Sequence, residues 1–238
     1  MFEKDNSIDA PADTLGATGL LTSNLYDATV DMAYMEKSAK GAQGVVLHFK
    51  LDSGRFYRET IYVTNREGKH IWEKGGRKGY LPGFVLFDEM CTVLTGKDAA
   101  ALEEPEAKTI KVYDFTARKE MPVEKPVLTS FIGKKLKLGI IELKEDHYQQ
   151  GSSWAEKNAI EKVFTSEGLT ASEINAGITS DGEFAEKWLN RYENAVQDKR
   201  KNSKGGSKFV YNGGQTSQET GAPAMAGESA TPSLFGDA

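Results

Sequence analysis

The chain has 238 residues, enough for one substantial domain with appendages or at most two small domains. Hydrophobic residues make up 39% and charged residues 27%, as in ordinary globular proteins, so collagen-like and fibrous architectures are excluded. Charged residues interrupt every apolar run before the roughly 20 residues that a membrane-spanning helix requires. The net charge of −5 argues against a protein that coats duplex DNA with a uniformly basic surface.

The N-terminal sequence and the cysteine content both favour a cytoplasmic protein without a membrane partner. The residues after Met1 are polar and acidic, whereas a secretory signal needs a basic segment followed by an apolar run. Cys91 is the single cysteine and has no Cys or His neighbour at metal-ligand spacing. It is therefore expected to be a small buried hydrophobic residue in a reducing compartment.

The first half of the chain predicts three strands and a long loop. After a leader without apolar periodicity, residues 24–34 alternate apolar and polar side chains, which places Tyr26, Val30 and Tyr34 on one face of a strand. Residues 45–51 and 55–64 are rich in β-branched and aromatic residues and flank the turn Asp52-Ser53-Gly54, so they predict a hairpin. The polar, glycine-rich segment 65–79 is long for a connection and predicts a functional loop.

A helix and further strands follow. Apolar residues at three- and four-residue spacing from Phe84 to Leu94, closed by Gly96, predict a helix. Strands are expected at 109–115 and 134–143, with a sixth at 159–164. This order predicts a mainly β protein with an OB-fold-like barrel of five to six strands and one inserted helix. Another small barrel or a two-layer α+β sheet would fit the same order.

Beyond the barrel the sequence predicts a helical extension and a disordered tail. Thr170 and Ser180 each begin a capping-box pattern that ends in glutamate, and the second helix carries an aromatic stripe, Phe184, Trp188 and Tyr192. This stripe is expected to pack in a core. From Asn202 the composition is too polar to offset the entropy of ordering. The predicted units are a flexible leader (1–19), an OB-fold domain (20–165), a helical extension (166–201) and a disordered tail (202–238).

The inventory of catalytic groups is small. The three histidines have no zinc-ligand spacing, and no nucleophile elbow or phosphate-binding loop occurs. We therefore expect neither an enzyme nor a metal ion or cofactor. The alternative is a nuclease-like site, in which Asp114 and Glu142 hold Mg²⁺ while Lys144 supports an attacking water.

Basic and aromatic residues alternate along the predicted hairpin and loop. Residues 44–80 contain eight basic and four acidic residues. Single-stranded nucleic acid is bound by a basic groove and by aromatic rings on which bases stack. Ile61 and Val63 are the clearest interior residues of the second hairpin strand, so Tyr57 is expected in the core and Arg58 and Tyr62 are the preferred contacts. On the first hairpin strand the alternation places Phe49 in the core and leaves His48 and Lys50 outward. The candidate DNA-binding residues are His48, Lys50, Arg55, Phe56, Arg58, Tyr62, Arg66, Trp72, Lys74, Arg77, Lys78 and Tyr80.

Four short motifs carry a family resemblance. The segments Asn24-Leu25-Tyr26-Asp27-Ala28, Tyr57-Arg58-Glu59-Thr60-Ile61-Tyr62-Val63-Thr64-Asn65, Leu81-Pro82-Gly83-Phe84 and Leu94-Thr95-Gly96-Lys97 together resemble the single-stranded DNA-binding proteins of tailed bacteriophages. The resemblance covers residues 20–191. It implies an OB core with a flexible C-terminal tail that protects replication or recombination intermediates in the cytoplasm of the infected bacterium, without performing chemistry.

The tail ends with an apolar pair near an acidic residue. Leu234, Phe235 and Asp237 could form a tip that binds replication or recombination proteins. The tail is less acidic than that of many single-strand binders, and its Ser-Leu-Phe sequence also resembles a sliding-clamp peptide. An unselected terminus is the third interpretation. The sequence also leaves open a homo-oligomer, or a structural adaptor that binds only proteins through the barrel and the aromatic stripe around Trp188.

Overall fold

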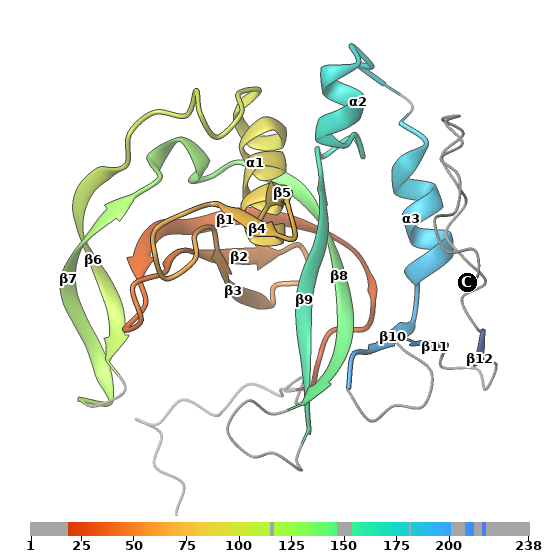
Figure 1. Ribbon diagram of the computed structural model, residues 1–238, viewed down its shortest axis with the longest axis horizontal. Helices are drawn as coiled ribbons and strands as arrows, with labels where there is room; N and C mark the ends of the chain where they lie inside the picture. Colours follow the sequence, from red (N-terminus) through yellow and green to blue (C-terminus); the bar gives the residue numbers. More distant parts are fainter. Residues whose placement is uncertain are drawn as a thin grey trace, which may run out of the picture.

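The computed structural model describes residues 19–114, 117–146, 154–180, 182–200, 208–211 and 216–217. Within these residues the protein is mainly β, as predicted. Ten strands belong to one sheet and two more form a separate hairpin, accompanied by three α-helices (Figure 1). Among the described helices, none combines the length and the apolar character that crossing a bilayer would require.

The central part of the sheet is built from five antiparallel strands. A meander joins β1 (Asn24–Lys37), β2 (Gln43–Leu51) and β3 (Phe56–Tyr62). The other side of β1 pairs with β8 (Lys135–Asp146), which pairs in turn with β9 (Trp154–Phe164). The resulting order is β3-β2-β1-β8-β9, so the two outer strands of this group are β3 and β9.

The sheet does not close into the predicted barrel. No backbone ladder joins β3 to β9 in the described residues. A side chain spans the two strands instead, because the Glu59 carboxylate on β3 accepts a hydrogen bond from the Ile160 backbone N–H on β9 at 2.8 Å. The hydroxyl of Tyr57 donates to the same carboxylate oxygen at 2.6 Å. The register of β9 shifts beside this contact, between the partners of Gly139 and Ile140.

Two hairpins are inserted between these strands, and the sequence did not predict either completely. β4 (Ile71–Lys74) and β5 (Arg77–Tyr80) form an ordered hairpin where a loop was expected. Its two-residue turn is Gly75-Gly76, whose φ angles of 58° and 75° fit the twist of antiparallel strands. The second hairpin pairs β6 (Glu106–Asp114) with β7 (Lys119–Val127). Figure 1 shows it as a curved wall at one end of the sheet.

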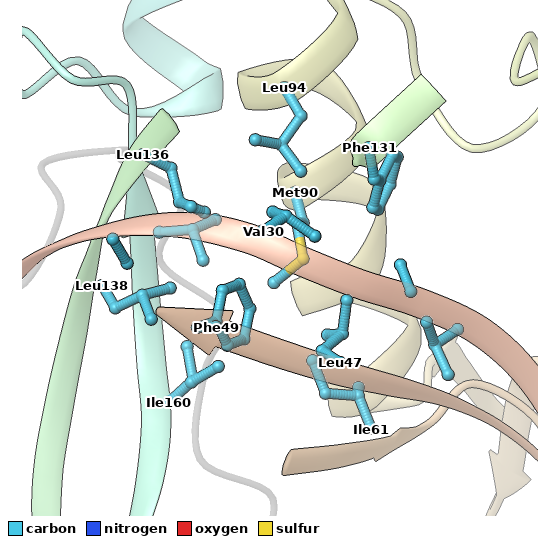
Figure 2. Close-up of a cluster of buried hydrophobic side chains, with 14 of the residues drawn as sticks. Val30, Leu47, Phe49, Ile61, Met90, Leu94, Phe131, Leu136, Leu138 and Ile160 are labelled. Atoms are coloured by element: carbon cyan, nitrogen blue, oxygen red, sulfur yellow. The ribbon is translucent and has the colours of Figure 1, made fainter. Parts of the chain in front are cut away.

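The main core lies between the inner face of the sheet and α1 (Pro82–Thr95), the helix that the spacing predicted. Gly96 ends this helix with a left-handed φ of 72°, as the C-cap pattern indicated. Cys91 is buried, as expected. Figure 2 shows Met90 of α1 lying between Val30 of β1 and Leu47 and Phe49 of β2. Phe131, in the short 3-10 helix η1 (Thr129–Phe131), packs against Phe87 of α1, with ring centroids 6.1 Å apart.

A β-bulge in β1 makes the prediction of which side chains share a face of this strand wrong for its second half. The pattern placed Tyr34 on the same face as Val30, but the register shifts between Val30 and Met32. One additional residue reverses the alternation of side chains. Val30 and Ala33 therefore lie in the main core, whereas Tyr34 belongs to a second cluster. That cluster lies under the β6–β7 hairpin and consists of Tyr34, Val46 and Val127 with Met32, Ile110 and Val112 packed against them.

The helical extension contains α2 (Ala171–Asn175) and α3 (Phe184–Tyr192). Thr170 and Glu173 form the predicted capping box at the start of α2. The second predicted start is wrong, because α3 has Glu183 as its N-cap residue, without a side-chain capping bond. Glu173 compensates by accepting a hydrogen bond from the Phe184 backbone N–H at 3.2 Å. Trp188 is 3% exposed and packs with Ile141 and Phe164, which confirms a core role.

Three short strands follow α3. β10 (Ala195–Asp198) runs parallel to β8 and pairs with it, inside the segment expected to be helical. β11 (Lys208–Tyr211) pairs with β10, and β12 (Thr216–Ser217) pairs with β11. The last two strands fall within 202–238, where the sequence predicted disorder. The rest of that segment, including Leu234, Phe235 and Asp237, lies outside the described residues, as does nearly all of the predicted leader.

Candidate nucleic-acid interface

The outer face of β2 and β3 combines exposed aromatic and basic side chains. The strand register sets Lys50 opposite Phe56 and His48 opposite Arg58. Lys50 and Arg58 are exposed, and Phe56 is 71% exposed to solvent. Side chains alternate across a strand, so the neighbours of these residues point inward. Phe49 is fully buried and packs against Tyr57, with ring centroids 6.4 Å apart, which confirms their predicted interior position.

Tyr62 extends this face toward the start of β2. It is 53% exposed and lies opposite Gly44 in the register. A Cβ on Gly44 would lie 3.3 Å from the ring of Tyr62 and 3.0 Å from the methyl of Thr60. The absence of a side chain at Gly44 therefore lets the tyrosine ring lie close to the strand, where its outer side remains available for stacking.

The β4–β5 hairpin presents a second aromatic and basic group. Trp72 pairs with Gly79, and a Cβ on that glycine would lie only 2.9 Å from the indole ring. The ring thus lies over the glycine and is 41% exposed. Lys74 pairs with Arg77 two residues farther along, so alternation places both on the face of Trp72. Both of these cations are exposed.

The opposite face of this hairpin connects it to α1. Tyr80 and His70 stack with centroids 5.8 Å apart, and each lies within 5.2 Å of the ring of Phe84 at the start of the helix. Lys78 lies on the same side and forms an ion pair with Glu73 at 3.6 Å. This aromatic cluster fixes the base of the hairpin, whereas Trp72, Lys74 and Arg77 extend from it.

The predicted residues therefore form two groups rather than one surface. His48, Lys50, Phe56, Arg58 and Tyr62 share the β2–β3 face, and Trp72, Lys74 and Arg77 share one face of the β4–β5 hairpin. Tyr80 and Lys78 are on the reverse face of that hairpin. Arg55 is half-buried and donates to the backbone carbonyl of Gly19 at 2.7 Å. Arg66 is exposed in the turn before β4.

Beside Arg58, the structure buries two polar atoms that the sequence did not single out together. The Tyr34 hydroxyl and His48 Nε2 are both inaccessible and make no hydrogen bond in the described part of the chain. Burial lowers the pKa of His48, and the positive charge of Arg58 lowers it further, whereas Asp31 opposes this effect. Burial also raises the pKa of Tyr34, whereas the charge of Arg58 and the closeness of its guanidinium to the hydroxyl lower it. The hydroxyl therefore lies near Arg58, although the geometry of the two groups does not make a hydrogen bond. Burial and the neighbouring guanidinium therefore both favour the neutral form of His48.

A separate cleft of about 710 Å³ lies between α1, β9 and α3. It bears on the adaptor alternative, for which the aromatic stripe of α3 was the suggested protein-binding surface. Trp188 is buried, so Phe184, at 43% exposure, is the main exposed part of that stripe. Two lysines beside the cleft are already paired, Lys162 with Glu89 at 2.5 Å and Lys187 with Glu183 at 2.6 Å.

The strand arrangement separates the elements of the alternative nuclease site. Asp114 ends β6, whose ladder partner is β7, whereas Glu142 and Lys144 lie on β8, between β9 and β10. Lys144 forms an ion pair with Glu156 at 2.9 Å. Across the described residues, no group of three His, Cys, Asp or Glu side chains is arranged to hold a metal ion.

Comparison with known proteins leaves the family open: no protein-family model matches this chain, and no curated protein matches it either.

Proposed function

We propose that this protein binds single-stranded DNA with little sequence preference and performs no chemistry on it. The observation that carries the proposal is the outer face of β2 and β3, where Phe56, Arg58 and Tyr62 project from one side of one strand beside Lys50. Exposed aromatic rings are costly to leave in water and supply surfaces on which unpaired bases stack. Neighbouring cations supply the contacts to phosphate.

The distribution of exposed rings supports this interpretation. The described residues have six exposed aromatic side chains, and four of them lie between positions 56 and 80. A duplex would offer its stacked bases only by their edges, whereas single strands offer whole ring faces. The face also lacks the recognition helix by which many duplex-binding proteins enter the major groove, at least among the described elements. A single strand is therefore the better fit.

The strand order supports an open, OB-like core. A three-strand meander is followed by a helix, by β8, which returns beside β1, and by β9, which pairs with β8. This order resembles that of the OB fold, whose second and third strands meet oligonucleotides. In this interpretation the two hairpins are insertions, and the Glu59 contact lies at the seam where a closed barrel would have a backbone ladder. The protein would then be a bacteriophage single-strand binder acting in replication or recombination.

The test is a comparison of oligothymidylate, the matched RNA and duplex DNA by fluorescence anisotropy. We expect tightest binding to oligothymidylate, with affinity falling steeply as salt rises. Arg58→Ala and Trp72→Ala should each weaken binding. Equal affinity for duplex and single strand, or no binding to any of the three at low salt, would overturn the proposal. The tail's binding of replication or recombination proteins is part of the same proposal, and pull-down with and without residues 232–238 tests it.

A further inference from the structure

The unpartnered atoms of Tyr34 and His48 lie at the border between two surfaces. The β6–β7 hairpin covers the sheet on one side of them, where Val127 pairs with Tyr34. On the other side lies the exposed face of β2 and β3, beginning with Arg58 opposite His48. The Tyr34 and His48 rings are neighbours, with centroids 6.0 Å apart. One hydroxyl, one imidazole and one guanidinium therefore meet where the proposed DNA-binding face joins the hairpin.

Leaving such atoms without partners is expensive. A buried polar group that makes no hydrogen bond costs free energy, so most native structures avoid it and many exceptions are functional. Tyr34 is only 1% exposed, and its hydroxyl can donate one hydrogen bond. His48 Nε2 can also donate when that nitrogen is protonated. Arg58 adds a planar array of N–H donors. All three groups can thus donate to the same acceptor.

The surrounding charges favour an anionic acceptor. Asp31 on β1 is the acidic group whose negative charge raises the pKa of His48. Glu36, also on β1, acts on Tyr34 but is already paired with Lys125 of β7 at 2.7 Å. The Lys125 ammonium lies 5.9 Å from the centre of the Tyr34 ring. With Arg58 on β3 and Lys125 on β7, the two cations balance the two acids, so a protonated His48 would make this group of side chains net positive.

We propose that Tyr34, His48 and Arg58 form a seat for one backbone phosphate of the bound strand, and that His48 takes up a proton when the phosphate binds. This inference rests on the proposed function. The seat is closed in the free protein, and the exposed Arg58 side chain moves outward with the phosphate to open it. The phosphate charge then stabilises the imidazolium, which donates from Nε2, while the Tyr34 hydroxyl donates to a second oxygen. No bond other than these hydrogen bonds is formed.

Proton uptake has a measurable consequence. When binding takes up one proton, the affinity increases by up to about tenfold for each unit by which the pH falls. This holds at pH values between the pKa of His48 in the free protein and its pKa in the complex. In the free protein the pKa of His48 lies below its ordinary value of 6.5, and a bound phosphate would raise it. The affinity should therefore depend on pH in the region around pH 6.5. The affinity for oligothymidylate should therefore increase as pH falls from 8 to 5.5.

The experiment measures this affinity across that pH range for the full chain and three variants. His48→Gln should bind with a flat profile, and Tyr34→Phe should bind several-fold more weakly at low pH while its urea midpoint stays at or above that of the unmodified protein. His70→Gln is the matched control, since His70 stacks on Tyr80 away from the seat, and it should keep the full slope.

The outcomes separate the two proposals. If no oligonucleotide binds at any pH, the single-strand-binding function fails and this inference fails with it. If oligothymidylate binds but His48→Gln keeps the slope of the unmodified protein, or Tyr34→Phe keeps its affinity, the phosphate seat alone is wrong. Calorimetry in two buffers of different ionisation enthalpy gives the proton count directly, and a count of zero at pH 6.5 would also overturn the seat.

Discussion

Glu59 and Ile160 join the two outer strands of the central five-strand group through one side chain. The Glu59 carboxylate, half-buried between β3 and β9, accepts the Ile160 N–H at 2.8 Å and the Tyr57 hydroxyl at 2.6 Å. Burial raises the pKa of Glu59, and the two hydrogen bonds and the charge of Lys157 only partly oppose this. The carboxyl group that bridges the two strands of the open sheet therefore also changes its protonation with pH.

The first prediction concerns stability against pH. The unfolded chain ionises Glu59 near its ordinary pKa of 4.5, whereas the folded protein resists ionisation until higher pH. The contribution of Glu59 to the free energy of unfolding is therefore fully present below pH 4.5. It is lost as the pH rises through the higher pKa that Glu59 has in the folded protein. Glu59→Gln keeps an acceptor oxygen and should remove this decline. Urea unfolding midpoints from pH 4 to 8 measure it, with the exposed Glu104→Gln as control.

Glu59→Ala is a separate prediction for the same contact. Truncation leaves the Ile160 N–H and the Tyr57 hydroxyl without their acceptor, which costs about 1–3 kcal/mol of unfolding free energy. Thermal or urea denaturation measures the loss. A change within 0.5 kcal/mol, the ordinary range of surface substitutions, would mean that the bridge does not hold β3 against β9.

The third prediction tests base stacking on β3. Phe56→Ala and Tyr62→Ala should each weaken binding of oligothymidylate by about 1–3 kcal/mol, the cost of losing one stacked base. Tyr113→Ala on the β6–β7 hairpin is the matched control, because that ring is 47% exposed and lies off this face. Anisotropy titration compares the three, and equal losses in all of them would remove the site assignment.

The fourth prediction uses Gly79 to displace Trp72 without deleting it. A methyl at this position would lie 2.9 Å from the indole ring, so Gly79→Ala must push the ring away. If Trp72 is a stacking surface, Gly79→Ala should reduce affinity to a similar extent as Trp72→Ala. Gly19→Ala adds the same methyl where nothing lies within 4 Å, and its affinity should match that of the unmodified protein.

The fifth prediction assigns Lys74 and Arg77 to phosphate contacts. Each contact to a single strand contributes a slope of about 0.7 to the dependence of log affinity on log salt. The double variant Lys74→Ala/Arg77→Ala should therefore flatten that slope by up to about 1.4, twice the single contribution. Lys119→Ala, an exposed lysine on β7, should leave it unchanged. An unaltered slope in the double variant would place the hairpin outside the interface.

Regular local patterns predicted much of the fold. The 3.6-residue spacing from Phe84 to Leu94 with Gly96 behind it gave α1 correctly, because helix periodicity and capping are local. The alternation in residues 45–51 predicted the inward position of Phe49, and the alternation around Ile61 predicted that of Tyr57, for the same reason. The Gly75-Gly76 pair was also a readable hairpin signal, although a long loop was expected from the polar composition around it.

The rest depended on contacts between distant segments. Pro122 and Pro126 weakened the strand signal of β7, although a strand paired on only one side for most of its length tolerates proline. Barrel closure depends on whether β3 reaches β9, which the pattern of neither strand encodes. The unpartnered atoms of Tyr34 and His48 were equally hidden, because the bulge that brings these rings together is an irregularity of register.

That bulge means that a single inserted residue changes which set of β1 positions faces the main core. Before Val30 the strand faces α1 with one set of positions, and after Met32 it faces α1 with the other set. If Asp31 instead occupied a regular position in a strand without the bulge, strict alternation would turn Tyr34 toward the helix and Ala33 toward the β6–β7 hairpin. The large ring would then crowd one layer while the small methyl left a void in the other, so the packing of both layers depends on this one irregularity of register.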